Sequence, residues 1–179
     1  MVPAPGQAAR VRRPRPGEIA EYYQGYVDGV PGDDVLATLE RNLVETRVLL
    51  EPLDERRAGH RYAPGKWSVK EVVGHVIDAE RVFAYRALRM ARGDPTPLAS
   101  FDQDAFVARS GSDRRALGEL LEELEHLRAA NLLFFRSLGE EDWERHGTAS
   151  ERPFVVCAFP WILAGHELHH RRVLVERYL

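Results

Sequence analysis

The chain is poor in cysteine, and Cys157 is the single one among its 179 residues. One thiol excludes both an intrachain disulfide and a zinc site built from several thiolates. The sequence also has no run of about 18 uncharged apolar residues, the length that a membrane-spanning helix needs. Its N-terminal region lacks the apolar core of a secretion signal. From these absences we expect a cytoplasmic protein that does not enter a membrane.

The sequence also has no large excess of positive or negative charge. Lys and Arg contribute 25 residues and Asp and Glu 28, so the net charge is −3. This balance argues against a broad surface for nucleic acid. Residues 1–17 hold four prolines and four arginines with little bulky apolar surface. We therefore expect a flexible tail over residues 1–17 and one folded domain over residues 18–179.

Apolar periodicity predicts two helices in the first half of that domain. Apolar residues recur at three- and four-residue spacing over residues 33–53, with an aspartate available as N-cap. Ser68 and Glu71 have the spacing of a capping box, in which each side chain binds a backbone amide of the other. This pattern predicts that a second helix begins at Ser68 and covers residues 68–92.

The second half predicts two more helices and two long connections. Asp113 is the expected N-cap of a helix over residues 113–138, and Pro160 suits the first turn of a helix that continues to the C-terminus. The connections, residues 94–111 and 139–159, are predicted to lack regular structure except for an extended piece late in the second. Because no segment alternates convincingly between apolar and polar residues, we expect an all-α four-helix bundle.

Histidines near the C-terminus interrupt the apolar face of the last helix. His166 and His170 are four residues apart, so they lie about 40° apart on a helix and both imidazoles can approach one metal ion. His75 lies at the edge of the apolar stripe of the second helix, where a residue lining a cavity between helices would be. His169 is a competing partner for His166. Spacing alone leaves open both a metal site and buried histidines that are satisfied by other core groups.

Three further residues are candidates for the walls of a pocket around these histidines. Glu71 is one turn before His75 and could orient its imidazole, although its capping-box role is the simpler interpretation. Asp104 could reach the pocket from the connection of residues 94–111, called the crossover below, or it could remain a solvated turn residue. Trp67 could form a wall or fill the core. Other polar residues are assigned to solvent, to ion pairs or to packing: His60, His126 and His146 to solvent, Glu80 to a salt bridge and Cys157 to the apolar interior.

A family resemblance emerges from the combination of these motifs. Its residues are Tyr62-Ala63-Pro64-Gly65-Lys66-Trp67-Ser68 followed by Glu71, His75, Asp78 and Glu80, then Phe101-Asp102-Gln103-Asp104, and finally Gly165-His166-Glu167-Leu168-His169-His170. With these segments the chain resembles the DinB family of DinB/YfiT-like metalloenzymes. The resemblance implies a four-helix bundle of up-down-down-up connectivity, association as a homodimer, and a divalent ion bound by His75, His166 and His170.

Two functions follow from that resemblance. One is a metal-dependent enzyme, either a hydrolase or an S-transferase that uses a bacterial low-molecular-weight thiol, in which three imidazoles leave a position open for water or a thiolate. Zinc or nickel is favoured over iron or manganese, and the substrate would be a small molecule. The alternative is a non-enzymatic, stress-related binding module whose metal site is structural or vestigial.

Overall fold

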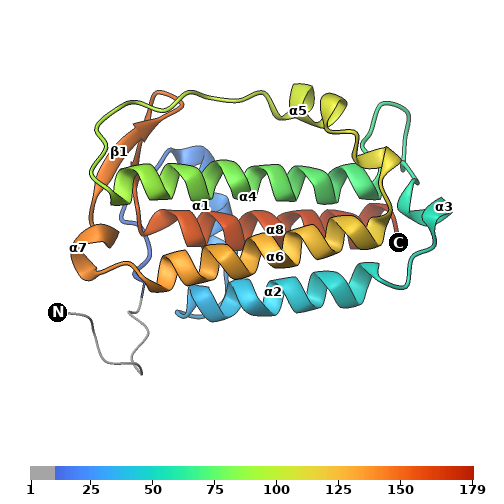
Figure 1. Ribbon diagram of the computed structural model, residues 1–179, viewed down its shortest axis with the longest axis horizontal. Coiled ribbons are helices and arrows are strands. Elements are labelled where there is room, and N and C mark those ends of the chain that lie inside the picture. The colour runs from blue at the N-terminus through green and yellow to red at the C-terminus, as the bar shows by residue number, and fades with distance from the viewer. Residues whose placement is uncertain (1–10) are drawn as a thin grey trace.

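The computed structural model describes residues 11–179, and four long helices run side by side through it (Figure 1). They are α2 (Val35–Leu50), α4 (Val69–Ala91), α6 (Leu117–Arg136) and α8 (Ala158–Arg177). Helices α2 and α8 run in one direction and α4 and α6 in the other (Figure 1). Both α2 and α4 pack against α6 and α8, which places α2 diagonally opposite α4. The predicted four-helix bundle and its up-down-down-up connectivity are confirmed.

Shorter elements surround the bundle. They are α1 (Glu21–Asp28), α3 (Glu55–Ala58), α5 (Gln103–Ser110), the 3₁₀ turn η1 (Ser112–Arg114), α7 (Glu140–Trp143), β1 (His146–Ala149) and β2 (Arg152–Val155). The strands form an antiparallel hairpin in which His146 lies opposite Val155. The hairpin and α7 lie at one end of the bundle and α3 at the other (Figure 1).

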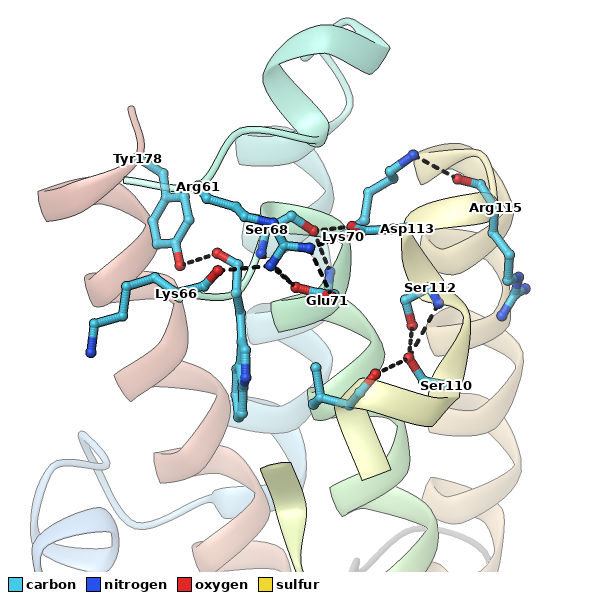
Figure 2. Close-up of polar contacts among 12 residues, drawn as sticks. Arg61, Lys66, Ser68, Lys70, Glu71, Ser110, Ser112, Asp113, Arg115 and Tyr178 are labelled. Carbon is cyan, nitrogen blue, oxygen red and sulfur yellow. Dashed lines mark hydrogen bonds and ion pairs between the residues drawn. The ribbon is translucent and has the colours of Figure 1, made fainter. Parts of the chain in front are cut away.

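The start of α4 has the predicted capping box. Ser68 Oγ accepts a hydrogen bond from the Glu71 amide at 3.1 Å, and Glu71 Oε2 accepts one from the Ser68 amide at 2.9 Å. The Glu71 carboxylate also binds Arg61, as Figure 2 shows. These contacts fix Glu71 as part of the helix start.

The predicted cap of the third helix is wrong. Asp113 lies in η1, and its carboxylate binds the Ser68 hydroxyl and the Arg61 guanidinium (Figure 2). Helix α6 begins four residues later, at Leu117, whose amide donates to Glu55 Oε1 at 3.1 Å. A carboxylate distant in sequence thus satisfies this amide, and local spacing cannot reveal such a partner.

The two connections contain more regular structure than predicted. Within residues 94–111, Asp102 caps the start of α5, because its Oδ1 atom accepts hydrogen bonds from the amides of Asp104 and Ala105. The helix ends before Gly111, whose φ of 69° is in the left-handed region. Residues 139–159 hold α7 and the hairpin. The extended piece expected at residues 153–158 is shorter, because β2 ends at Val155 and α8 has begun by Ala158.

Residues 11–17, the last part of the predicted tail, are docked on the bundle. Val11 is buried, and the Arg12 carbonyl accepts a hydrogen bond from Trp161 Nε1 at 2.9 Å. The Arg13 guanidinium lies 4.0 Å from the centre of the Trp161 ring and donates to the carbonyls of Val27, in the last turn of α1, and Val30, just after it. The remainder of the predicted tail, residues 1–10, lies outside the described residues.

A polar layer divides the hydrophobic core. One apolar cluster lies towards the hairpin and α7, and the other towards α3. In every long helix, buried polar residues fall between members of the two clusters: Asn42 and Thr46 in α2, Glu80 in α4, Arg128 in α6 and Glu167 in α8. Buried polar groups need partners, so this layer has to be connected by hydrogen bonds across the bundle.

Among residues 11–179, the helices are all too short or too polar to cross a bilayer.

Candidate metal centre

Three histidine side chains meet between α4 and α8. His75 Nε2 lies 3.0 Å from His166 Nε2, and His170 Nε2 lies 3.1 Å from the same atom. Ligand atoms of the three residues all lie within 4.8 Å of one another. The four-residue spacing in α8 presents two of these rings on one face, and α4 presents the third from across the interface.

Burial keeps these imidazoles neutral. His75 is 3% exposed and His166 is 6% exposed. Burial lowers the pKa of His75 to about 4, against a weaker opposite effect of Asp104, and lowers that of His170 to about 3. The pKa of His166 is also lowered by burial, and further by His170, His75 and His169. Neutral imidazole is the form that binds a metal ion.

The arrangement of nitrogen atoms fits a cation. A neutral imidazole has one protonated nitrogen and one lone pair. A proton on one Nε2 atom forms a good hydrogen bond with one neighbour, so three converging Nε2 atoms do not satisfy one another fully. Nitrogens bound to zinc at about 2.0–2.1 Å in a tetrahedron are separated by about 3.3 Å, close to the two short separations seen here. A divalent ion could therefore be held with little movement of the rings.

A glycine lets α1 cover the cluster. A Cβ atom at Gly165 would lie 2.0 Å from the backbone oxygen of Tyr26, so only glycine permits this approach of α1 to α8. As a result the Tyr26 ring lies 5.6 Å from the His166 ring, centre to centre. The Trp67 ring lies 4.8 Å from that of His75. Contacts with these aromatic rings explain why His75 is buried, although its sequence position places it at the edge of the apolar stripe.

Two cavities with room for a small molecule border the cluster. The larger, about 530 Å³, reaches His170 and is lined by Trp67, Asp104 and Tyr178 among others. The smaller, about 180 Å³, reaches His75 and His166 and has walls rich in aromatic rings. The tyrosines Tyr22, Tyr23 and Tyr26 of α1 line the smaller cavity. They are not among the residues predicted from the sequence to line the pocket, although their clustering in one short segment was a signal.

Of the three residues predicted to line the pocket, two line the larger cavity and one does not. Trp67 and Asp104 both line the larger cavity, so the structure brings them to the site. Trp67 is half-buried and its carbonyl accepts a hydrogen bond from the Tyr178 hydroxyl at 2.7 Å. Glu71 is engaged by Ser68 and Arg61 as described above, and these contacts leave it no role in orienting His75.

The other histidines and the cysteine lie apart from the three converging rings. His60, His126 and His146 are exposed, as predicted. His169 is half-buried and is absent from the group whose nitrogens converge. Cys157 is fully buried, and burial raises the pKa of its thiol to about 12. Such a thiol is a poor nucleophile at neutral pH, consistent with its predicted place in the apolar interior.

Behind the histidines, the polar layer forms a closed network. Arg128 donates to both oxygens of Glu80, at 2.7 Å each, and to Glu167 at 2.8 Å. Thr46 donates to the second Glu167 oxygen at 2.7 Å. The predicted salt bridge of Glu80 is confirmed. Because every charged group here has charged partners, we assign this network to structure rather than chemistry.

Comparisons with known proteins agree with this architecture. A model of the DinB superfamily matches residues 38–174. The structure is similar to YfiT from Bacillus subtilis, described as a probable metal-dependent hydrolase with an unusual four-helix bundle topology. That match has a TM-score of 0.70 and 18% identity, and covers 92% of this chain and 90% of YfiT.

A second solved structure, the mycothiol-dependent maleylpyruvate isomerase, matches with a TM-score of 0.65 and 17% identity, covering 81% of this chain and 61% of the isomerase. At these identities the likeness is one of fold. A search of curated protein sequences finds no significant match. The family model spans more than half of the residues, so the chain belongs to the DinB superfamily.

Proposed function

We propose that this protein is a metal-dependent enzyme that joins a low-molecular-weight thiol to a small electrophile. The observation that carries the proposal is the convergence of His75, His166 and His170 at the border of two cavities. A divalent ion on three imidazoles, zinc or nickel by preference, supplies a Lewis acid with an open position at which the pKa of a thiol or water falls. Two cavities suit two substrates, which favours thiol transfer over hydrolysis.

The remaining roles fall to residues of the cavity walls. The larger cavity has room for the thiol, and Asp104 is the acidic residue in its wall, suited to take the proton that the thiol loses. The sulfur then forms a bond to an electrophilic carbon of a molecule in the smaller cavity. Either the bond from that carbon to a leaving group breaks and the leaving group takes the electron pair and the proton, or a carbon–carbon double bond gives its π pair to the adjacent carbon, which takes the proton. The buried, neutral histidines and the covering Tyr26 and Trp67 limit access of water to this position.

The first test is the metal content of the purified protein. We expect about one ion per chain in the wild type and less than about 0.2 in His75→Ala, His166→Ala and His170→Ala, because each loses one of three ligands. His126→Ala is the matched control, since it removes an exposed imidazole, and His169→Ala tests the competing ligand. A wild-type protein prepared without chelators that holds no ion would overturn the proposal.

The second test separates an enzyme from a binding module. Consumption of mycothiol and of cysteine is followed with a chloronitrobenzene and with a chloronitrobenzoate as electrophiles, in metal-loaded wild type and in Asp104→Asn. We expect turnover that needs the ion and falls about tenfold or more in Asp104→Asn. If the ion binds, no thiol is consumed and its removal sharply lowers the melting temperature, the non-enzymatic alternative holds instead. Release of product from ester or amide substrates without thiol would favour the hydrolase.

Dimer formation, the choice of metal and cytoplasmic localisation stay predictions from the sequence and its family.

A further inference from the structure

The smaller cavity runs along α4, away from the histidines. His75, Ala79 and Phe83 line it from successive turns of the helix. Arg86 comes eleven residues after His75, which is about 16 Å along the axis and within about 20° of the same direction. Long side chains lean towards the N-terminus of their helix, so the Arg86 guanidinium is closer to the histidines than its Cα atom is.

Arg86 is packed among residues that line this cavity. Its guanidinium carbon lies 5.6 Å from the centre of the Phe83 ring and 5.7 Å from that of Phe101, and it donates to Ser150 Oγ at 3.0 Å. All three of these neighbours line the cavity. Arg86 itself is not a lining residue: it lies directly behind the wall that Phe83, Phe101 and Ser150 form, away from His75 and His166.

The guanidinium is buried but incompletely partnered. Arg86 is 2% exposed. Its Nη2 atom donates two hydrogen bonds, to the Ala99 carbonyl at 2.8 Å and to Ser150 Oγ, whereas Nη1 has no hydrogen-bond partner among the described residues. If Arg86 served only to hold the crossover and the hairpin together, the two hydrogen bonds of Nη2 would be sufficient. The second nitrogen is left for another group.

No acid of this chain neutralises Arg86. Its hydrogen bonds go to a carbonyl and a hydroxyl, and the group that partly offsets its burial is the phenol of Tyr23, which also lines the cavity. Residues 1–10 contain no Asp or Glu. A buried cation without an anion is costly, because desolvation is not offset by an opposite charge. An anion from outside the chain would supply that charge.

The Ser150 contact is itself maintained against strain. The two residues of the β1–β2 turn, Ser150 and Glu151, have φ of 52° and 60°, the left-handed region that favours glycine. The hairpin is held by the crossover, because the Leu98 amide donates to the Thr148 carbonyl and the Ser150 amide donates to Leu98. Strain of this kind is frequent where a side chain must be aimed at a site. Here it aims the Ser150 hydroxyl at Arg86 and the cavity.

We propose that Arg86, with Ser150, is the binding subsite for a carboxylate of the small substrate, so that the electrophile is a small organic acid lying between Arg86 and the histidine cluster. This inference deepens the proposed function and rests on it for the reaction, but not for the binding. The cavity volume of about 180 Å³ limits the acid to a small one, and the aromatic walls favour a planar one.

The test measures binding of two carboxylates against their neutral amides. Benzoate and benzamide, and acetate and acetamide, are titrated calorimetrically into wild type, Arg86→Met, Arg86→Lys and Arg92→Met. The protein is first stripped of metal and dialysed free of chelator, so that a carboxylate cannot bind an ion instead. Arg92→Met is the matched control, because it makes the same exchange at an exposed arginine of the same helix end.

We expect wild type and Arg92→Met to prefer at least one carboxylate over its amide. Affinity for that carboxylate should fall about 10- to 100-fold in Arg86→Met, with an intermediate loss in Arg86→Lys, which keeps the charge but not the two-nitrogen fork. Binding of the amide should hardly change. A merely structural role of Arg86 would weaken carboxylate and amide alike.

Two results would overturn the subsite. One is a wild type that fails to prefer either carboxylate, a result that does not depend on the folding of any variant. The other is carboxylate binding that persists in a folded Arg86→Met or Arg86→Lys protein. Failure of the metal proposal would look different, since it appears in the metal content of the histidine variants and leaves the stripped-protein titration unchanged.

Discussion

Two arginines lie almost wholly inside this bundle, yet the chain treats them in opposite ways. Arg128 is 1% exposed and Arg86 is 2% exposed. Burial lowers the pKa of Arg128, but Glu167 and Glu80 outweigh it, and the net pKa is raised. Burial lowers the pKa of Arg86, and Tyr23, the group that opposes this effect, does not outweigh it. The two arginines are therefore equally buried, but the protein neutralises Arg128 and leaves Arg86 for an anion from another molecule.

The same contrast separates the polar layer from the histidine cluster. In the layer, donors and acceptors are matched across four helices, and the result is rigidity. In the cluster, lone pairs converge with too few protons to join them. The polar groups that we assign to structure have all their hydrogen-bond and charge partners inside the protein, and those that we assign to function do not. Depth of burial does not separate the two sets.

The largest expected effect comes from breaking the complete network. Arg128→Met leaves two buried carboxylates without their cation, and we expect it to reduce the free energy of unfolding by about 3–5 kcal/mol. Urea denaturation followed by circular dichroism measures this change. A loss below about 1 kcal/mol would mean that the network does not depend on the guanidinium.

Removal of one carboxylate should cost less. Glu80 binds two nitrogens of Arg128 and Glu167 binds one, so we expect losses of about 2 kcal/mol for Glu80→Gln and about 1 kcal/mol for Glu167→Gln. Either change leaves one carboxylate to balance the cation. The same denaturation experiment ranks the two variants, and a reversed order would contradict the assignment of Glu80 as the main partner.

A third arginine, nearer the surface, gives a smaller and pH-dependent effect. Hydrogen bonds from Arg12 lower the pKa of Glu18 from 4.5 to about 2. Because the folded-state pKa is the lower one, the interaction stabilises the fold fully above pH 4.5 and is lost as the pH falls towards 2. We expect about 1–2 kcal/mol, after solvent screening, to vanish over that window.

Arg12→Met supplies the control for this pH dependence. The variant should lack that part of the stability at pH 7 and show a flatter decline with acid. Unfolding free energies measured in urea at neutral and acidic pH for both proteins test the expectation. Parallel curves for wild type and variant would assign the acid sensitivity to other carboxylates.

The smallest stability effect is expected at Arg86. Arg86→Met loses two hydrogen bonds but also removes an uncompensated buried charge, so the free energy of unfolding should change by less than about 1 kcal/mol. Compared with Arg128→Met in the same experiment, this variant tests the contrast directly. A loss as large as that of Arg128→Met would show that Arg86 is structural.

Much of the fold was predictable because its signals are local. The capping box of Ser68 and Glu71 and the three- and four-residue apolar spacing depend on neighbours in sequence, and α4 begins where predicted. The pairing of His166 with His170 likewise follows from helical geometry, and His75 was a candidate from its place at the edge of an apolar stripe; the resemblance joined the three as one ligand set. These are residues whose partners lie within one or two turns or in a known motif.

The failures share a dependence on distant partners. Glu55 caps α6, so Asp113 was free to bind Ser68 and Arg61 instead. The importance of Arg86 arises from which groups are absent around it, and one-dimensional spacing carries no such information. The tyrosines of α1 reach the site only because Gly165 lets two helices touch.

The connectivity of the bundle has a consequence for how fast it folds. Helices α2 and α4 follow each other in sequence but lie diagonally, as do α6 and α8, so neither pair can form as a local helical hairpin. The consecutive pair that does pack, α4 with α6, is joined by residues 92–116, which include the crossover. Loop closure must therefore precede most helix packing, and we expect slower folding than in an up-and-down bundle of this size.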